Sequence, residues 1–431
     1  MQRVLVLDRN RQPLMPCHPA RARELLREGK AAVFRRYPFT IILQEREGGE
    51  TQETRLKLDP GSKVTGMALV ADCTRRGKVV VWAAELEHRG DKIRMALHNR
   101  WSQRRSRRSR KTRYRPARFR NRRRPEGWLA PSLQHRVDTT MTWVQRLMRW
   151  TPVAGISTML HRFDTQAMQN PEISGTEYQR GELLGYEVRE YLLEKWGRKC
   201  AYCDAGNLPL TIDHIHPKST GGSDRVSNLA LACFPCNQRK SNRDVAEFLA
   251  HDPKRLARIE AQRKAPLRDA AAVNATRNIL FGRLLELGLP IETGSGGRTR
   301  FNRSQQGYPK AHWIDAACVE ETGECVRLNP EYRPLQITAT GHGRRQMQNM
   351  TKKGFPRGKA KSRQKIYFGF QTGDMVRAVV PRGRFEGTHV GRVACKKSGN
   401  FKLKANGKEM DGVSWRHCTP IHRADGYAYA H

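Results

Sequence analysis

Four cysteines in two closely spaced pairs are the first residues in this sequence whose types and spacing suggest chemistry. Cys200 and Cys203 form one C-x-x-C pair, and Cys233 and Cys236 form a second. Two such pairs can supply four thiolates to a tetrahedral zinc ion, and a closed set of four leaves no coordination position open for a substrate. We therefore expect a structural Zn²⁺ site. The gap between the pairs is longer than in a simple zinc ribbon, so a further element can be built inside it.

That gap contains "DHIHP" at residues 213–217 and "GGSDRVSNL" at residues 221–229, and "CNQRK" follows at residues 236–240. This pattern resembles the HNH (ββα-metal) nucleases. The resemblance implies that His214 is the general base for an attacking water. It also implies that Asp213 and Asn237 supply oxygen ligands to one catalytic Mg²⁺, and that Asn228 braces the loop holding His214. Many HNH proteins have histidine at the position of Asn237, and asparagine keeps an oxygen ligand there. A plain zinc-binding recognition module is the alternative, but it would not need these residues at these spacings.

A second set of candidate Mg²⁺ ligands is spread far along the chain. Asp59 ends a strand pattern in "TRLKLDPGSKVTG", and His312 and Asp315 lie in the helical pattern "KAHWIDAACV". Residues i and i+3 share one helix face, so His312 and Asp315 can point toward the same site. An aspartate at a strand end is often only a turn cap. Together, however, the three residues resemble the catalytic set of RuvC and RNase H nucleases, which bind two metals through carboxylates from distant segments.

The overall charge of the chain indicates which kind of partner it binds. The 431 residues carry a formal net charge of +40, with a pI of about 10.6. Such an excess predicts a polyanionic partner, most commonly nucleic acid. A basic membrane-surface protein would need an amphipathic or lipidated anchor, and no apolar run approaches the ~20 residues of a membrane span. The N-terminus lacks signal-peptide features, so we expect a cytoplasmic prokaryotic protein that acts at the nucleoid, with its cysteines as thiols or metal ligands.

The segment from Arg100 to Arg124 is dominated by arginine. A helix is expected to begin near Asp91 and to run into it, although like charges at i,i+4 positions repel. Phosphate contacts would order such a helix, and arginine suits bidentate phosphate binding. A disordered basic tail is the alternative. The residues expected to contact nucleic acid are Arg100, Arg104, Arg105, Arg107, Arg108, Arg110, Arg113 and Arg115.

The order of these features resembles IscB, a transposon-encoded RNA-guided (OMEGA) DNA endonuclease with the ancestral layout of type II CRISPR effectors. "PLMP" at residues 13–16 matches the motif that names the family's N-terminal domain, and residues 162–181 and 299–319 are close to family wording. The resemblance covers essentially the whole chain. It implies a long structured guide RNA, a double-stranded DNA target and a monomeric protein within the ribonucleoprotein. The guide would supply sequence specificity, and the arginine helix would cradle the RNA–DNA hybrid.

The resemblance also implies the fold class and the domain order. We expect an α/β multidomain protein with an RNase H-like (RuvC) mixed sheet split in sequence, an arginine-rich bridge helix, an inserted HNH domain and a C-terminal small β-barrel-like domain. The expected domains are an N-terminal PLMP domain at 1–53, RuvC parts at 54–89, 131–196 and 247–330, the bridge helix at 90–130, the HNH domain at 197–246, and at 331–431 a basic β domain that reads the target-adjacent motif.

One residue breaks the family pattern. The family's middle RuvC carboxylate, a glutamate, lies on the strand before "RFDTQ", and Met159 occupies its place here. A thioether is a poor ligand for Mg²⁺. Three explanations are open: the carboxylate was lost naturally, it was removed by mutation, or a nearby acid such as Asp164 substitutes for it. We favour natural loss. The chain would then nick only the guide-paired strand, through its HNH site. The alternatives are a protein-guided HNH endonuclease and an RNA-guided DNA-binding protein without cleavage.

Overall fold

The computed structural model describes residues 3–109, 125, 127–160, 188–189, 192–193, 195–206, 208–263, 268–342, 347–351, 355–360, 364–405 and 407–430. Four candidate site residues named above fall outside these ranges: Arg110, Arg113, Arg115 and Asp164. In this part of the chain, no helix is long and apolar enough to cross a membrane.

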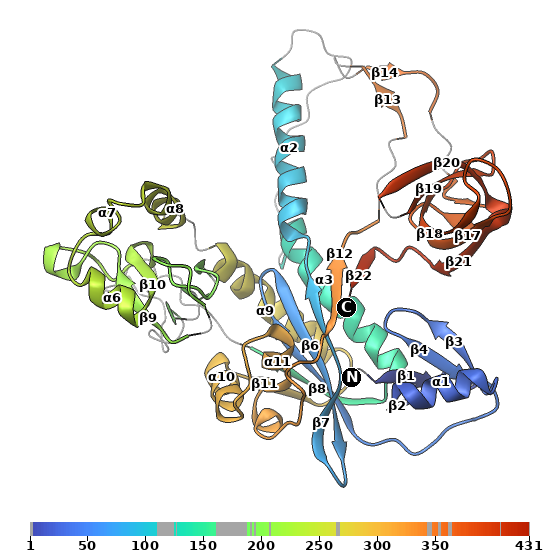
Figure 1. Ribbon diagram of the computed structural model, residues 1–431, viewed down its shortest axis with the longest axis horizontal. Helices are drawn as coiled ribbons and strands as arrows, with labels where there is room; N and C mark the ends of the chain where they lie inside the picture. Colours follow the sequence, from blue (N-terminus) through green and yellow to red (C-terminus); the bar gives the residue numbers. More distant parts are fainter. Residues whose placement is uncertain are drawn as a thin grey trace.

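A seven-stranded mixed sheet forms the centre of the molecule (Figure 1), with the strand order β11-β8-β5-β6-β7-β12-β22. β5, β6 and β7 form an antiparallel meander, and β8 lies parallel to β5. The seven strands of the sheet are β5 (Thr54–Pro60), β6 (Val64–Cys73), β7 (Gly77–Glu87), β8 (Val153–Met159), β11 (Ile291–Gly294), β12 (Leu335–Ala339) and β22 (Tyr427–Ala430). One sheet is thus assembled from widely separated segments of the chain.

Helices cover both faces of this sheet. The apolar stripes of α3 (Pro131–Trp150) and α9 (Arg268–Leu285) pack with strand residues such as Leu56 and Leu58 in the largest core cluster. The other face holds α10 (Gly296–Gln305) and α11 (His312–Ala317), and α11 packs on small residues such as Ala68 and Ala83. Alternation of side chains along β5 therefore sends Leu56 and Leu58 to one face and Asp59 to the face that α11 covers.

The N-terminal unit is a four-stranded sheet of order β2-β1-β4-β3, with α1 (Pro19–Arg27) between β2 and β3 in sequence. Its strands are β1 (Val4–Leu7), β2 (Pro13–Cys17), β3 (Ala31–Arg35) and β4 (Thr40–Leu43). The "PLMP" residues belong to β2, where every second side chain is buried and the backbone pairs with β1. Its proline content gives little sign of a strand, but a Pro can occupy an edge strand because it has no N–H to donate.

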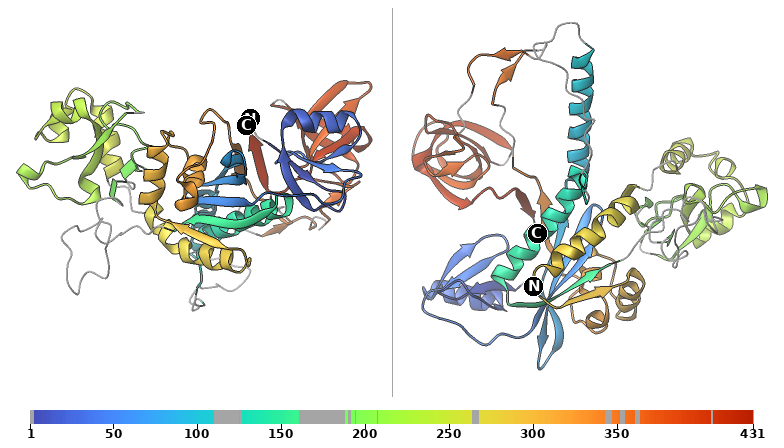
Figure 2. Two further views of the ribbon diagram at one scale, coloured as in Figure 1. Left: turned by 90° about the horizontal axis from the view of Figure 1, so that it is seen from below. Right: turned by 180° about the vertical axis from the view of Figure 1, so that it is seen from behind.

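Helix α2 (Gly90–Arg108) begins at the expected position and projects away from the sheet (Figures 1 and 2). In the described part of the chain its main helix neighbour is α3, and its described side chains are exposed or half-buried. A helix this basic gains little from burial, so its arginines remain available for a polyanion.

The C-terminal hundred residues contribute two strands to the central sheet and also form a five-stranded sheet and two short hairpins. β12 and β22 are strands of the central sheet, so the interval 331–431, expected as one domain, starts and ends inside the central domain. Between them lies a five-stranded antiparallel sheet of order β20-β19-β18-β17-β21, and no described strand pair closes it into a barrel. Its strands are β17 (Met375–Val380), β18 (Gly387–Ala394), β19 (Asn400–Ala405), β20 (Lys408–Ser414) and β21 (Cys418–His422). Two short hairpins precede it: β13 (Asn349–Met350) with β14 (Pro356–Arg357), and β15 (Ile366–Tyr367) with β16 (Phe370–Gln371).

The cysteine-containing segment forms a separate lobe on the opposite side of the central sheet from the N-terminal unit (Figure 1). It contains the antiparallel pair β9 (Leu210–His214) and β10 (Leu229–Cys233), followed by α6 (Phe234–Lys240), α7 (Val245–Phe248) and α8 (Pro253–Arg263). Its own apolar cluster, which includes Leu231 and Ile259, shows that this lobe has an independent core.

Candidate functional site

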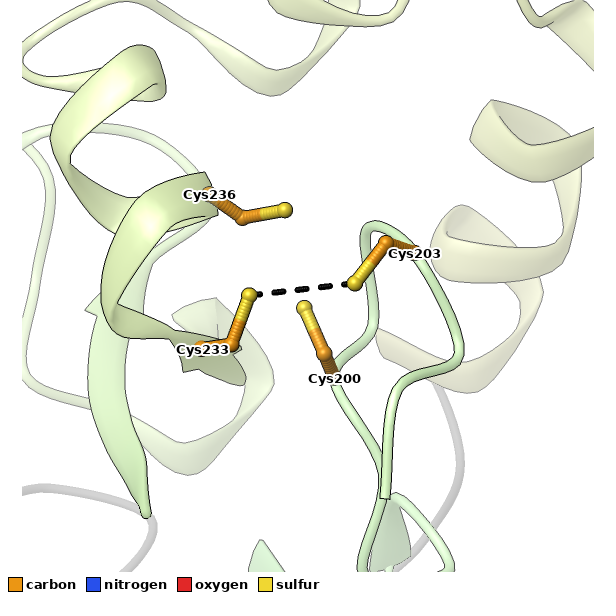
Figure 3. Close-up of side chains that lie close together, drawn as sticks. All are labelled: Cys200, Cys203, Cys233 and Cys236. Atoms are coloured by element: carbon orange, nitrogen blue, oxygen red, sulfur yellow. Dashed lines mark hydrogen bonds between the residues drawn. The ribbon is translucent and has the colours of Figure 1, made fainter. Parts of the chain in front are cut away.

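The four cysteines of the lobe converge, and Figure 3 shows their sulfur atoms pointing toward one another. Their sulfur atoms all lie within 4.8 Å of one another, and the Sγ atoms of Cys203 and Cys233 are 3.7 Å apart. Four thiolates around zinc at about 2.3 Å would have sulfur–sulfur distances of about 3.8 Å. The donor set therefore fits a structural Zn²⁺. Burial raises the pKa of the Cys236 thiol to about 12 when no metal is present, so binding of a metal would deprotonate it.

β9, β10 and α6 form a ββα unit directly beside this cluster. His214 is the last residue of β9 and pairs with Leu229 of β10, while Cys233 ends β10 and begins α6. Helix α6 packs against both strands. The unit therefore carries the expected base His214, the expected ligands Asp213 and Asn237, and the second cysteine pair on three adjoining elements.

His214 is oriented by an acidic residue that the sequence pattern did not identify. Its Nε2 lies 2.7 Å from Oδ1 of Asp224, whose other oxygen pairs with Lys218 at 2.5 Å. Lys218 and His214 lower the pKa of Asp224, so this carboxylate remains charged. If Nε2 carries the proton shared with Asp224, Nδ1 is the unprotonated nitrogen and can accept a proton from water.

Asp213 has a different environment from its neighbour, because its side chain is only 8% exposed. The hydroxyl of Tyr202 donates to Oδ2 of Asp213, and Nζ of the fully buried Lys240 lies 3.2 Å from the same oxygen. Lys240 also donates to the main-chain carbonyl of His214 at 2.7 Å. Burial and the adjacent Asp213 raise the pKa of Tyr202 well above its usual range, so its hydroxyl remains a donor.

Asn237 and Asn228 have distinct roles in this unit. Nδ2 of Asn237 donates to Oγ1 of Thr211 at 3.0 Å, which places Asn237 over the β9 face that also carries Asp213. A carboxylate and an amide on one face are hard oxygen donors that fit one Mg²⁺. Buried Asn228 bonds the main chain of His216 through both of its side-chain polar atoms and also donates to the carbonyl of Ser223. Asn228 thus ties together the loop that follows His214.

The second expected site lies where β5 and α11 meet. Asp59 is buried near the end of β5, and its Oδ2 lies 3.4 Å from Nδ1 of His312. The close approach depends on Gly66, which pairs with Asp59 on β6, because a Cβ there would lie 1.9 Å from the carbonyl oxygen of His312. The structure therefore brings Asp59 and α11 together from opposite ends of the sequence.

Asp315, one turn after His312, is paired with two cations of the protein. Its Oδ1 lies 2.8 Å from Nε of Arg303, and its Oδ2 pairs with Nζ of Lys310. Burial and nearby Asp59 raise the pKa of Asp315, while Lys310 and Arg303 oppose that shift. Within the described residues, only the four cysteines converge as a tight group of metal-ligating side chains. Asp59, His312 and Asp315 are neighbours without forming such a group.

Met159 stands beside Asp59 at the end of the sheet. β8 and β5 are parallel, with Thr158 opposite Leu58, so the next residues of these two strands, Met159 and Asp59, are neighbours. Met159 lines a pocket together with Pro60, Thr158, Leu160, Val273, Thr276, Arg277, Leu280 and Phe281. A thioether therefore lies next to Asp59 at this strand end, and it offers no oxygen ligand to a metal.

A buried polar group beneath this site was not expected from the sequence. Lys57 precedes Asp59 by two residues on the same face of β5, and its Nζ donates to the Val319 carbonyl at 2.8 Å. Burial lowers the pKa of Lys57 to about 7, and the nearby Glu292 opposes that shift. Glu292 accepts hydrogen bonds from Ser157 and Thr322. These contacts anchor β11 and the segment after α11 around the strand that carries Asp59.

The arginines of α2 that the structure describes lie along an extended surface. Arg104 and Arg105 are exposed, Arg100 and Arg108 are half-exposed, and Arg105 stacks over the ring of Trp101 at 5.6 Å. Trp101 is itself 45% exposed. Arg107 belongs to the helix. This surface combines positive charge with an aromatic ring, as nucleic-acid-binding surfaces do.

Tyr202, Asp224 and Lys240 are the site residues that sequence reasoning missed. A local signal existed for Lys240, because it follows Asn237 by three residues and so shares its helix face. Tyr202 lies inside the first C-x-x-C pair, and Asp224 inside "GGSDR". Nothing in those two positions alone indicates that their side chains contact Asp213 and His214.

Comparison with protein families matches two parts of the chain. Residues 200–243 match the HNH endonuclease family. This segment is an HNH endonuclease domain. Residues 4–181 match a family described as RRXRR protein, which spans the N-terminal unit, α2 and the first strands of the central sheet. Each of these two family matches covers less than half of the chain. A comparison of the chain with curated proteins found no match.

Solved structures similar to this chain include Cas9 proteins. Streptococcus thermophilus Cas9 in complex with the GGAA PAM is 11% identical, with a TM-score of 0.22, covering 61% of this chain and 32% of that one. The Type II-C Cas9 enzyme from Actinomyces naeslundii is 19% identical, with a TM-score of 0.18, covering 44% of this chain and 31% of that one. The chain thus aligns with only about a third of these longer proteins, and at these scores the likeness does not define its fold.

Proposed function

We propose that this protein is an RNA-guided DNA endonuclease that nicks one strand through its HNH domain. The observation that carries the proposal is the ββα unit of the HNH-matching segment, in which His214, Asp213 and Asn237 lie together beside a four-cysteine cluster. Nucleases need a general base next to hard oxygen ligands, and these three residues supply both.

In this mechanism, each residue of the HNH site has one task. Asp224 holds the His214 imidazole, so that Nδ1 can take the proton from the attacking water. Lys240 fixes the end of β9 through the His214 carbonyl, and Asn228 fixes the loop beyond it. Mg²⁺ held by Asp213 and Asn237 would neutralise the scissile phosphate and the leaving oxygen. Zn²⁺ at Cys200, Cys203, Cys233 and Cys236 would hold α6 against the first cysteine turn.

Nicking, as opposed to double-strand cutting, follows from the second site. Asp59, His312 and Asp315 provide part of a RuvC-like ligand set on a split sheet. Met159 provides no oxygen ligand, and Lys310 and Arg303 neutralise Asp315. We propose that this site does not cut the displaced strand, and that the HNH site cuts the guide-paired strand.

Guidance by RNA is supported by the charge and by α2. The net charge of +40 suits a long polyanion, and α2 presents arginines on a helix that stands free of the sheet. The partners proposed are a long structured guide RNA and double-stranded DNA, with one protein copy per complex in the prokaryotic cytoplasm. The proposed division is a PLMP domain, a three-part RuvC domain, a bridge helix, an HNH insert and a basic C-terminal β domain that reads the target-adjacent motif.

The test begins with expression of the chain together with the genomic DNA that flanks its gene. RNA that co-purifies is sequenced, and plasmids are built with matching target sites beside randomised flanking bases. We expect a defined RNA and target-dependent conversion of supercoiled plasmid to open circle. A purified protein that nicks without RNA would support protein-guided HNH cleavage instead. An RNA-bound protein that binds its target and leaves the plasmid supercoiled with Mg²⁺ would support a binding protein.

A further inference from the structure

The four-cysteine cluster is connected to the proposed Mg²⁺ ligand Asp213 through a single side chain. Tyr202 lies between Cys200 and Cys203, in the turn that would bind the metal. Its side chain is buried, and its hydroxyl donates to Oδ2 of Asp213. The ring also packs edge-to-face on Phe248, with 5.5 Å between the two ring centroids.

Asp213 has a second constraint that comes from the other cysteine pair. Helix α6 carries Cys236, Asn237 and Lys240, and Lys240 reaches the same carboxylate. The first cysteine pair thus fixes Asp213 through Tyr202, and the second fixes it through α6. A carboxylate has about four lone-pair sites, so two fixed donors set its rotation and determine which sites remain available to a metal.

We propose that Tyr202 is a positioning residue that transmits the geometry of the four-cysteine cluster to the Mg²⁺ ligand Asp213. The inference rests on the proposed HNH nuclease function and adds a requirement to it. The four-cysteine cluster then has a role beyond stabilising the lobe, because the Tyr202 hydroxyl sets the orientation of the Asp213 carboxylate. Donors that orient a metal ligand from outside the coordination sphere typically change metal affinity or activity by roughly 10–100-fold.

Tyr202→Phe is the variant that tests this inference, because it removes the hydroxyl and keeps the ring. The zinc content is measured by elemental analysis, and Mn²⁺ binding is measured by electron paramagnetic resonance on the full chain. The HNH-specific Mn²⁺ signal is defined as the part lost in Asp213→Ala. We expect Tyr202→Phe to keep its zinc and to bind Mn²⁺ about tenfold more weakly. Nicking should require about tenfold more Mg²⁺ and should recover in part at high Mg²⁺.

Two matched controls separate positioning from general damage. Tyr308→Phe removes a hydroxyl that donates to the Val326 carbonyl at 2.8 Å, far from the HNH lobe in sequence. Phe248→Leu loosens the packing of the Tyr202 ring without removing its hydroxyl, so its effect on Mn²⁺ binding should be smaller than that of Tyr202→Phe. Tyr308→Phe should bind Mn²⁺ as the parent does.

Two results would overturn the inference while leaving the nuclease proposal intact. One is parent-like Mn²⁺ binding and Mg²⁺ dependence in Tyr202→Phe. The other is loss of zinc from Tyr202→Phe, which would make the hydroxyl part of the fold of the cluster. By contrast, a parent protein whose Mn²⁺ binding and nicking do not depend on Asp213 would overturn the proposed function itself, and the inference with it.

Discussion

Restoring a carboxylate at Met159 tests why only one strand is expected to be cut. Met159 ends β8 beside Asp59 and is half-buried, so Met159→Glu keeps a side chain of similar length at a strand end. Full burial of a Met side chain is worth roughly 1.5–3 kcal/mol, so the half-buried thioether should cost about 1 kcal/mol to replace. The variant should therefore remain folded.

The gain in the cleavage rate of the displaced strand can be estimated from the change in activation free energy. A new oxygen ligand that lowers the barrier for the displaced strand by about 4 kcal/mol would raise that rate about a thousandfold. Metal binding would also have to displace Lys310 from Asp315; the Lys310 side chain is 27% exposed, so it has room to move. We expect the parent to convert supercoiled target to open circle, and Met159→Glu to yield linear product with Mg²⁺.

Two further variants make this result specific. Adding Asp59→Ala to Met159→Glu should return the product to open circle, because both carboxylates belong to one site. Arg277 lines the same pocket as Met159 and is a competing partner for a new glutamate. Met159→Glu with Arg277→Gln should therefore cut at least as fast as Met159→Glu alone. Linear product from the unmodified parent would refute the reasoning about Met159 directly.

Three other perturbations address the remaining parts of the account. Cys200→Ser or Cys236→Ser should release one zinc per chain and unfold the lobe, since metal binding there is folding free energy; a parent preparation without zinc by elemental analysis would contradict this. Lys240→Met leaves the buried Asp213 carboxylate without its ion pair and should destabilise the lobe by roughly 3–5 kcal/mol, read as faster hydrogen exchange in β9 and β10. Lys195→Met is the matched control, because among the described residues Lys195 donates to the main-chain carbonyls of Val226 and Arg263 and not to a carboxylate. Hydrogen exchange in Lys195→Met as fast as in Lys240→Met would show that the Lys240–Asp213 ion pair has no special role. Arg104→Gln and Arg108→Gln should each lower the salt slope of RNA binding by roughly 0.7–0.9, and an unchanged slope would show that α2 does not contact the RNA.

Local patterns predicted part of the site. The two C-x-x-C pairs predicted one group of four cysteines, and the structure brings these cysteines together beside a ββα unit. The i,i+3 spacing of His312 and Asp315 predicted that both lie on one helix, and in the structure both belong to α11, next to Asp59. In these cases the chemistry lies on one element or on the ends of neighbouring elements.

Contacts between distant elements were not predictable in the same way. Lys310 and Arg303 are two of the chain's 81 lysines and arginines, and nothing local indicates that both pair with Asp315. β12 and β22 are separated by a complete five-stranded sheet, so their shared place in the central sheet is visible only in the fold. Asp224 approaches His214 because Asn228 shapes the intervening loop, a consequence of several hydrogen bonds at once.

The most direct test of the central claim is strand-resolved mapping of the nick in a target plasmid. The RNA-loaded parent, His214→Ala and Asp59→Ala are compared on substrates labelled separately on each strand, and target binding is measured in parallel. We expect the parent and Asp59→Ala to cut only the guide-paired strand, at equal rates. We expect His214→Ala to bind the target normally and to cut neither strand, because a general base acts in the transition state and not in binding. Cleavage of the guide-paired strand by His214→Ala at the parent rate would contradict the role of His214 as the general base.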